Sequence, residues 1–163
     1  MVLEKGDMWS QWGKCDLWLF TGNSYITKKK ELVMGRGLAL AVKKRYPDIP
    51  RLIANSIGAP RFRAGDMAGN AINVAWSIYG VSKIVYEQAN GYVGVFQVKQ
   101  HFRDKAQLAL IGHSTLVLQE QIRQHGFERI DMNFAGIGYG GLERTHVLPI
   151  ISELPDCVHV WEY

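Results

Sequence analysis

The sequence is short of cysteine, of long apolar runs and of histidines at metal-ligand spacing. Its two cysteines, Cys15 and Cys157, both lie inside apolar stretches, which excludes a disulfide framework and favours core thiols in a reducing compartment. No apolar run approaches the ~20 residues that a membrane span needs, and the charged opening residues are unlike a secretory signal. We therefore expect a cytoplasmic protein with no membrane partner.

The five histidines are scattered along the chain and none has a paired cysteine, so we predict no metal site and no cofactor. The chain also lacks internal repeats, low-complexity segments and a linker rich in proline or serine. Its 163 residues, 47% of them hydrophobic, are enough to bury a full core without disulfides or metal. These features predict one domain over residues 1–163, and we expect a monomer.

Acidic residues are scarce between residues 28 and 63, where ten lysines or arginines stand against only Glu31 and Asp48. This segment has a formal charge of +8 and the rest of the chain −4, so the net charge of +4 is concentrated in one place. Such a block favours a polyanionic partner, which includes nucleic acid, a nucleotide or an acidic protein. A solvated basic face without a ligand explains the same pattern.

Short apolar runs alternate with segments of helical character. Strands are predicted at 15–20, 82–88, 92–98, 129–134 and 157–163, with a further one near 70–79. Within residues 33–47, a helix is predicted to follow the two glycines and to end at Pro47. A second helix is predicted over 104–124, with Gly126 as its C-terminal cap. A third helix is predicted within 141–154. This alternation predicts an α/β fold with a largely parallel sheet.

Two glycine-rich loops lie at predicted strand-to-helix connections. The stretch "MGRGLAL" places Gly35 and Gly37 ahead of a helix, and "AGIGYGG" has four glycines between residues 136 and 141. Ligands of α/β sheets bind at the carboxyl ends of strands, where helix N-termini and bare N–H groups hold anions. Neither loop matches a Walker or a Rossmann fingerprint. Each loop alone is explained by a structural turn, but two in one small domain predict a pyrophosphate cradle.

Two polar residues also follow predicted strands. Asn23 comes after the first strand, where an amide can close a turn or hydrogen-bond a ligand hydroxyl. Lys99 comes after the strand at 92–98. It is either a solvated lysine that flanks the end of a strand or a catalytic amine. In a partly dry pocket such a lysine has a lowered pKa and can attack an anomeric carbon, or it stays charged and stabilises a leaving group.

Four segments in the right order resemble the macrodomain family, and together they cover most of the chain. They are "KGDMWSQWGKCDLWLFTGNS", "MGRGLALAVKKRYP", "FQVKQHFRD" and "GIGYGGLERTHVLPII". The last three are most similar to the branch of terminal ADP-ribose glycohydrolases and DarG-like DNA ADP-ribosyl glycohydrolases. The resemblance implies a three-layer α/β/α sandwich with a mixed central sheet and a cleft for ADP-ribose.

The resemblance also implies which residues form that cleft. Lys99 would be catalytic at the anomeric C1″ carbon, with Asn23 holding the distal ribose. Asp7 would accept a hydrogen bond from the adenine amino group, with Met8 nearby. The other implied ADP-ribose-binding residues are those of the two glycine loops: Met34, Gly35, Arg36, Gly37, Leu38, Gly136, Ile137, Gly138, Tyr139, Gly140 and Gly141.

Several positions depart from the family pattern. Val98 stands where the family has a threonine before the lysine, and Gly141 or Leu142 stands where some relatives have a carboxylate. The segment "ITKKKEL" is an insertion whose three lysines suit phosphate contacts at the rim of the cleft, or an exposed solubilising loop.

Taken with the resemblance, these features predict a hydrolase that removes ADP-ribose from a modified macromolecule, either DNA or protein. Nucleic acid is a possible partner through the basic segment 28–63. One alternative is a non-catalytic reader or sequestering protein for ADP-ribose or a related nucleotide. Another is a phosphatase that acts on ADP-ribose 1″-phosphate.

Overall fold

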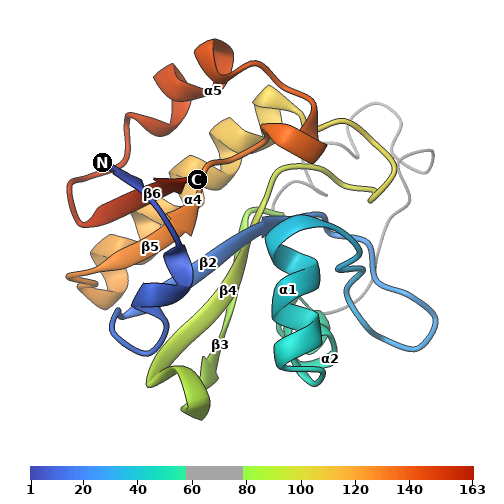
Figure 1. The fold of residues 1–163 in the computed structure, drawn as a ribbon. Helices are drawn as coiled ribbons and strands as arrows, with labels where there is room; N and C mark the ends of the chain where they lie inside the picture. The colour runs from blue at the N-terminus through green and yellow to red at the C-terminus, as the bar shows by residue number, and fades with distance from the viewer. Residues whose placement is uncertain (58–78) are drawn as a thin grey trace.

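The computed structural model describes residues 1–57 and 79–163, which form a six-stranded sheet with helices on both faces (Figure 1). In chain order the strands are β1 (Val2–Lys5), β2 (Leu17–Gly22), β3 (Val81–Tyr86), β4 (Gly91–Gln97), β5 (Ile130–Asn133) and β6 (Val158–Glu162). The α-helices are α1 (Gly37–Arg45), α2 (Ile49–Ile57), α4 (Leu108–His125) and α5 (Arg144–Ile151). Short 3₁₀ turns are η1 (Met8–Gln11), η3 (Glu87–Ala89) and η4 (Gly138–Gly140).

The sheet is mostly parallel, as the alternation of elements predicts. Its strand order is β1-β6-β5-β2-β4-β3, and β3 is antiparallel to its neighbour β4. The central strand β2 pairs in parallel with β5 on one side and with β4 on the other. Because these three strands run in the same direction, their carboxyl ends reach the same edge of the sheet. That edge is therefore where the segments after β2, β4 and β5 meet.

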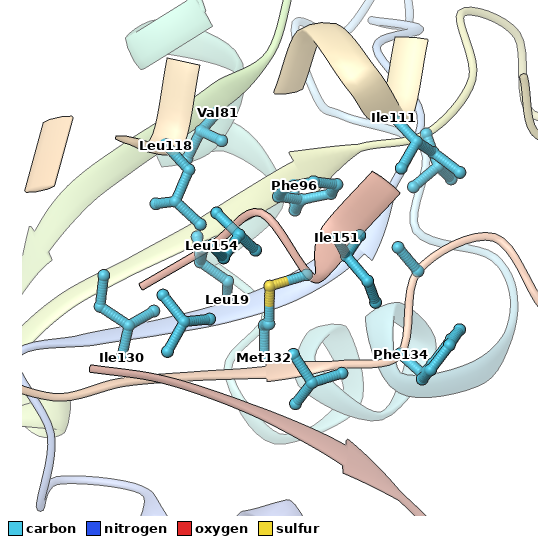
Figure 2. Packing of buried hydrophobic residues seen from close by; sticks show 14 of the residues in the cluster. Leu19, Val81, Phe96, Ile111, Leu118, Ile130, Met132, Phe134, Ile151 and Leu154 are labelled. Carbon is cyan, nitrogen blue, oxygen red and sulfur yellow. The ribbon is translucent and has the colours of Figure 1, made fainter. Parts of the chain in front are cut away.

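Successive side chains of β2 point to opposite faces of the sheet, so each face is covered by its own hydrophobic core. Leu19 packs with Leu118 of α4 and Ile151 of α5 in one core (Figure 2). Phe20 packs with Val42 of α1 in the other core, to which α2 also contributes. The two helical layers and the sheet between them confirm the predicted α/β/α sandwich.

Two elements are missing from the sequence predictions. Strand β1 has mostly exposed side chains and pairs only with β6, so it lacks the apolar alternation that marks a buried strand. Helix α2 begins shortly after Pro47, and its Ile49 and Ile53 are fully buried at helical spacing. The predicted stop at Pro47 thus separates two helices rather than ending the helical region.

The prediction that a helix begins at Asp104 is wrong, because α4 begins four residues later. The N–H of Ala106 donates to the carbonyl of Gly140 at 2.9 Å, and the N–H of Gln107 donates to the carbonyl of Val98 at 2.8 Å. These donors are therefore committed to neighbouring loops before the helical pattern starts. The segment from Lys99 onwards is consequently a loop that returns to the end of β4.

The other end of α4 is as predicted, since Gly126 caps it with a φ of +66°. The strand predicted near 70–79 lies, apart from Tyr79, outside the described residues. Cys15 is buried, Cys157 is half-buried and both thiols are free. Over residues 1–57 and 79–163, no helix is both long and apolar enough to cross a membrane, and no group of three or more metal-ligating side chains is gathered.

Candidate functional site

A cavity with a volume of about 570 Å³ opens at the shared carboxyl edge of β2, β4 and β5. The segments that bound it are the ends of these strands, the N-terminal turn of α1, the loop after β4 and the glycine loop after β5. The predicted residues that line it are Asn23, Met34, Gly35, Arg36, Gly37, Leu38, Lys99, Gly136, Ile137, Tyr139 and Gly140. Residues that are distant in sequence thus meet at one site.

The first glycine loop brings the N-terminus of α1 to the cavity. Gly37 has a φ of +59°, a conformation that favours glycine, and no side chain caps the helix at Arg36. The first N–H groups of a helix have no acceptor within it, and here they belong to Gly37, Leu38 and Ala39, which all line the cavity. These donors and the positive end of the helix dipole suit an anionic ligand.

The second glycine loop contains positions whose positive φ favours glycine. Gly136 has a φ of +75°, and a Cβ there would lie 2.7 Å from the Cδ1 of Ile111. The N–H of Leu142 donates to the carbonyl of Gly136 at 3.0 Å and closes the loop. The loop carries the exposed ring of Tyr139 to the other side of the cavity, where the guanidinium of Arg36 lies 5.5 Å from its centroid. The two loops therefore meet through this cation–π contact.

Asn23 is buried and uses its amide within its own segment. Its Oδ1 accepts from the N–H of Tyr25 at 2.9 Å, and its Nδ2 donates to the carbonyl of Val33 at 2.9 Å. The turn-closing role expected for an asparagine here is therefore present. The residue also lines the cavity, and its second N–H proton and second oxygen lone pair remain for a ligand.

A second asparagine lines the cavity at the end of β5. Asn133 accepts from the backbone N–H of Thr21 at 2.9 Å and donates to the Thr21 hydroxyl at 2.8 Å. This reciprocal pair joins the carboxyl ends of β5 and β2 at the cavity floor. Asn133 was missed because it lies within the strand predicted at 129–134 and is the last residue of β5, whereas Asn23 follows its strand.

Lys99 enters the cavity from the end of β4. Its side chain is half-buried, and its Nζ donates to the backbone carbonyl of Asp104 at 3.1 Å. Burial lowers the pKa of the Lys99 ammonium, and the positive charge of Arg36 lowers it further, whereas the charge of Asp104 opposes the shift. The lysine thus has the partly dry surroundings that make an amine a better proton donor or nucleophile than a solvated one.

The charge on the cavity wall is mainly positive. Arg36, Lys99 and Arg103 line it, and Asp104 is the single carboxylate among its described lining residues. Such a wall attracts a ligand that carries phosphate groups. The lysines of the inserted segment do not belong to it.

That insertion forms a hairpin-like loop. The N–H of Val33 donates to the carbonyl of Tyr25 at 3.0 Å, and Ile26 pairs with Leu32 in an antiparallel bridge. The base of the loop lines the cavity through Val33, whereas residues 28–30 are exposed at its tip. The lysines are therefore presented to solvent on a short, hydrogen-bonded arm.

Four of the predicted binding residues are not among those that line the cavity: Asp7, Met8, Gly138 and Gly141. Asp7 caps η1 by accepting from the N–H of Trp9 at 2.9 Å. Met8 is buried, and its carbonyl accepts from the indole of Trp18 at 3.2 Å. Both contacts are structural in this chain, and their role in adenine binding stays a prediction.

Several lining residues were missed: Thr21, Gly22, Val33, Ala39, Val98, Phe102, Arg103, Asp104 and Asn133. Asp104 was missed because it was assigned to the helix predicted over 104–124, whereas Phe102 and Arg103 lie just before that helix and were not considered as site residues. The available signal was their position directly after Lys99 at a strand end, since the loop that follows a catalytic candidate belongs to the same edge of the sheet.

The mixed sheet, the two helical layers and the glycine-lined cavity at the carboxyl edge together give this chain the macrodomain fold. The macrodomain of Mycobacterium tuberculosis DarG has a TM-score of 0.69 to it at 22% identity, with 99% of this chain and 97% of that chain covered. The macrodomain of Thermus aquaticus DarG has a TM-score of 0.65 at 19% identity, over 99% and 96% of the two chains.

A further neighbour is Thermosipho africanus DarTG, described as a complex with ADP-ribose. It has a TM-score of 0.64 at 18% identity, and the match covers 98% of this chain and 41% of that one. No protein-family model and no curated protein matches this sequence. The likeness to these proteins is therefore one of fold.

Proposed function

We propose that this chain binds ADP-ribose in the cavity and hydrolyses the bond that joins ADP-ribose to a modified macromolecule. The observation that carries the proposal is the meeting of Lys99 with two glycine loops at a single cavity. The free N–H groups of α1 and the glycine loop after β5 suit a diphosphate, while Asn23 and Asn133 offer hydrogen bonds to ribose hydroxyls. The fold neighbour that holds ADP-ribose supports the choice of ligand.

The binding half of the proposal predicts selectivity in calorimetry. We expect ADP-ribose to bind more tightly than ADP, ATP or NAD, because only ADP-ribose has a free distal ribose next to a diphosphate. Arg36→Ala should weaken ADP-ribose binding by about tenfold or more, since charge-assisted contacts contribute about 1.5–3 kcal/mol. Arg51→Ala makes the same charge change at an exposed position of α2 outside the cavity, and should leave binding unchanged. Equal weakening by both variants, or no ADP-ribose binding by the wild type, contradicts the proposed site.

A non-catalytic reader is the second candidate. It is favoured by the second glycine loop, which ends without a carboxylate on the cavity, because Glu143 is exposed and is not among the lining residues. A reader binds ADP-ribosylated macromolecules and releases them unchanged. Incubation of wild-type protein with ADP-ribosylated DNA and with ADP-ribosylated protein, followed by chromatography of free ADP-ribose, separates the two candidates.

We further propose that the exposed lysines contact the phosphates of a nucleic acid that carries the modification. Replacing Lys28, Lys29 and Lys30 together by alanine should weaken binding to single-stranded DNA. The slope of log K against log salt should become shallower by about 2, since each phosphate contact on a single strand contributes about 0.7. Binding measured by fluorescence anisotropy at several salt concentrations gives the slope. Lys5→Ala, which removes one exposed lysine outside the arm, is the control and should leave the slope unchanged. An unchanged slope identifies the arm as a solubilising loop.

A further inference from the structure

The backbone of Asp104 is held next to Lys99 by hydrogen bonds of both its carbonyl and its N–H group. Its carbonyl accepts from the Nζ of Lys99 at 3.1 Å, and its N–H donates to the carbonyl of His101 at 3.1 Å. Two residues later, the N–H of Ala106 donates to Gly140 in the second glycine loop. The loop therefore places Asp104 between the end of β4 and the glycine loop, on the wall of the cavity.

Hydrolysis at an anomeric carbon requires two proton transfers, which the residues that line the cavity would carry out. One group must protonate the leaving atom, and another must take a proton from the attacking water. Lys99 is a cation with a pKa below its usual value, so it is suited to the first task. The group for the second task must be unprotonated at neutral pH so that it can accept a proton, and a carboxylate meets this requirement. It must also lie in the same site as the proton donor.

Asp104 is the carboxylate that the described part of the cavity offers. Asp104 and Lys99 line the same cavity, and the negative charge of Asp104 opposes the lowering of the Lys99 pKa. Glu143, at the N-cap of α5, and Asp104 are both exposed, but only Asp104 is among the residues that line the cavity. The fold thus supplies a carboxylate from the loop after β4 and not from the loop after β5.

We infer that Asp104 is the general base of the proposed hydrolase and that Lys99 is its acid partner; this inference rests on the proposed function. A water oxygen forms a bond to C1″ while the bond from C1″ to the target atom breaks. The water proton passes to the Asp104 carboxylate, and the Lys99 ammonium gives a proton to the departing target atom. The products are ADP-ribose with a hydroxyl at C1″ and the unmodified target. Transfer of the proton from Asp104 to Lys99 then restores the starting state.

The two roles are separated by a probe that needs no acid. ADP-ribose with an α-linked 4-nitrophenyl group at C1″ has a leaving group that departs without protonation, but water must still be activated. With this probe we expect Asp104→Asn to lower kcat about a hundredfold and to leave the dissociation constant of ADP-ribose within about twofold. Lys99→Ala should lose far less activity on the probe than on ADP-ribosylated DNA or protein. Glu143→Gln is the matched control, and should behave as the wild type.

Chemical rescue tests whether the carboxylate itself acts. Added formate should restore part of the activity of Asp104→Ala, because a small carboxylate can occupy the space that the side chain leaves. Wild-type kcat in Asp104→Asn overturns the inference. Loss of ADP-ribose affinity in parallel with kcat and without formate rescue also overturns it, since it shows that Asp104 only shapes the loop. A wild-type protein that binds ADP-ribose but releases neither nitrophenol nor ADP-ribose overturns the proposed hydrolase itself, a result distinct from the other two.

Discussion

Replacement of Lys99 by alanine should reduce hydrolysis of ADP-ribosylated DNA or protein about a thousandfold while ADP-ribose binding changes only a few fold. The ammonium reaches the cavity from the end of β4, where it can stabilise charge that develops on the leaving atom. Its contribution to binding should be smaller, because Arg36 and the N–H groups of α1 also line the cavity and suit a diphosphate. Single-turnover rates and calorimetry on the same variant measure the two effects separately.

The pH dependence of kcat distinguishes the two roles open to this lysine. The pKa of Lys99 is lowered from 10.5 by burial and by Arg36. If the ammonium donates a proton, activity is present below that lowered pKa and falls as the pH rises through it. If the neutral amine attacks C1″, activity rises over the same range and a covalent adduct accumulates. We expect the first behaviour.

Lys99→Arg is the control for charge alone. Arginine keeps the positive charge but does not release a proton at any accessible pH, so it should bind ADP-ribose and turn over slowly, without the alkaline decline. Full activity in Lys99→Arg contradicts proton transfer and leaves electrostatic stabilisation as the role. Full activity in Lys99→Ala contradicts catalysis by this residue altogether.

The sequence predicted the cavity because strand ends could be identified. In β2, Phe20 and its apolar neighbours mark a buried strand, and Asn23 follows directly. In β4, the buried run ends just before Lys99. Parallel pairing of β2 with β4 and β5 then brings the residues after these strands to one edge, whatever lies between them in the chain. This inference required only three strands: the strands predicted at 15–20, 92–98 and 129–134 overlap β2, β4 and β5, and these three are parallel, whereas β1 was not predicted.

Asp104 was missed for a physical reason that lies outside local sequence. Helical spacing of apolar residues extends back to Ala106, so local pattern places the helix start too early. The residues before the observed start of α4 instead make long-range contacts, because the N–H groups of Ala106 and Gln107 donate to the carbonyls of Gly140 and Val98. Such contacts exist only after the sheet has formed. The place of Asp7 near a ligand was implied by family likeness and stays a prediction; in the structure its side chain caps η1.

A second large effect is expected from Asp131→Ala, which should lower the free energy of unfolding by about 3 kcal/mol. Asp131 is fully buried in β5 and accepts from the Nη2 of Arg129 at 2.7 Å and the indole of Trp161 in β6 at 2.7 Å. A ring nitrogen of His159 lies 3.1 Å from the Nη1 of Arg129, and its other ring nitrogen lies 2.7 Å from Oε1 of Glu4 in β1. Removing the carboxylate leaves a partly buried guanidinium without its counter-charge and an indole N–H without its acceptor.

Urea denaturation of Asp131→Ala and of Glu120→Ala provides the comparison. Glu120 pairs with Arg123 on the exposed surface of α4, so its loss should change stability by about 0.5 kcal/mol or less. Equal, small effects of the two variants contradict a stabilising role for the buried carboxylate. Because β5 continues from Asp131 to Asn133 on the cavity floor, added ADP-ribose should recover stability in Asp131→Ala, as any ligand that binds only the folded state does. The network of Glu4, His159, Arg129, Asp131 and Trp161 thus links β1, β6 and β5 through their side chains.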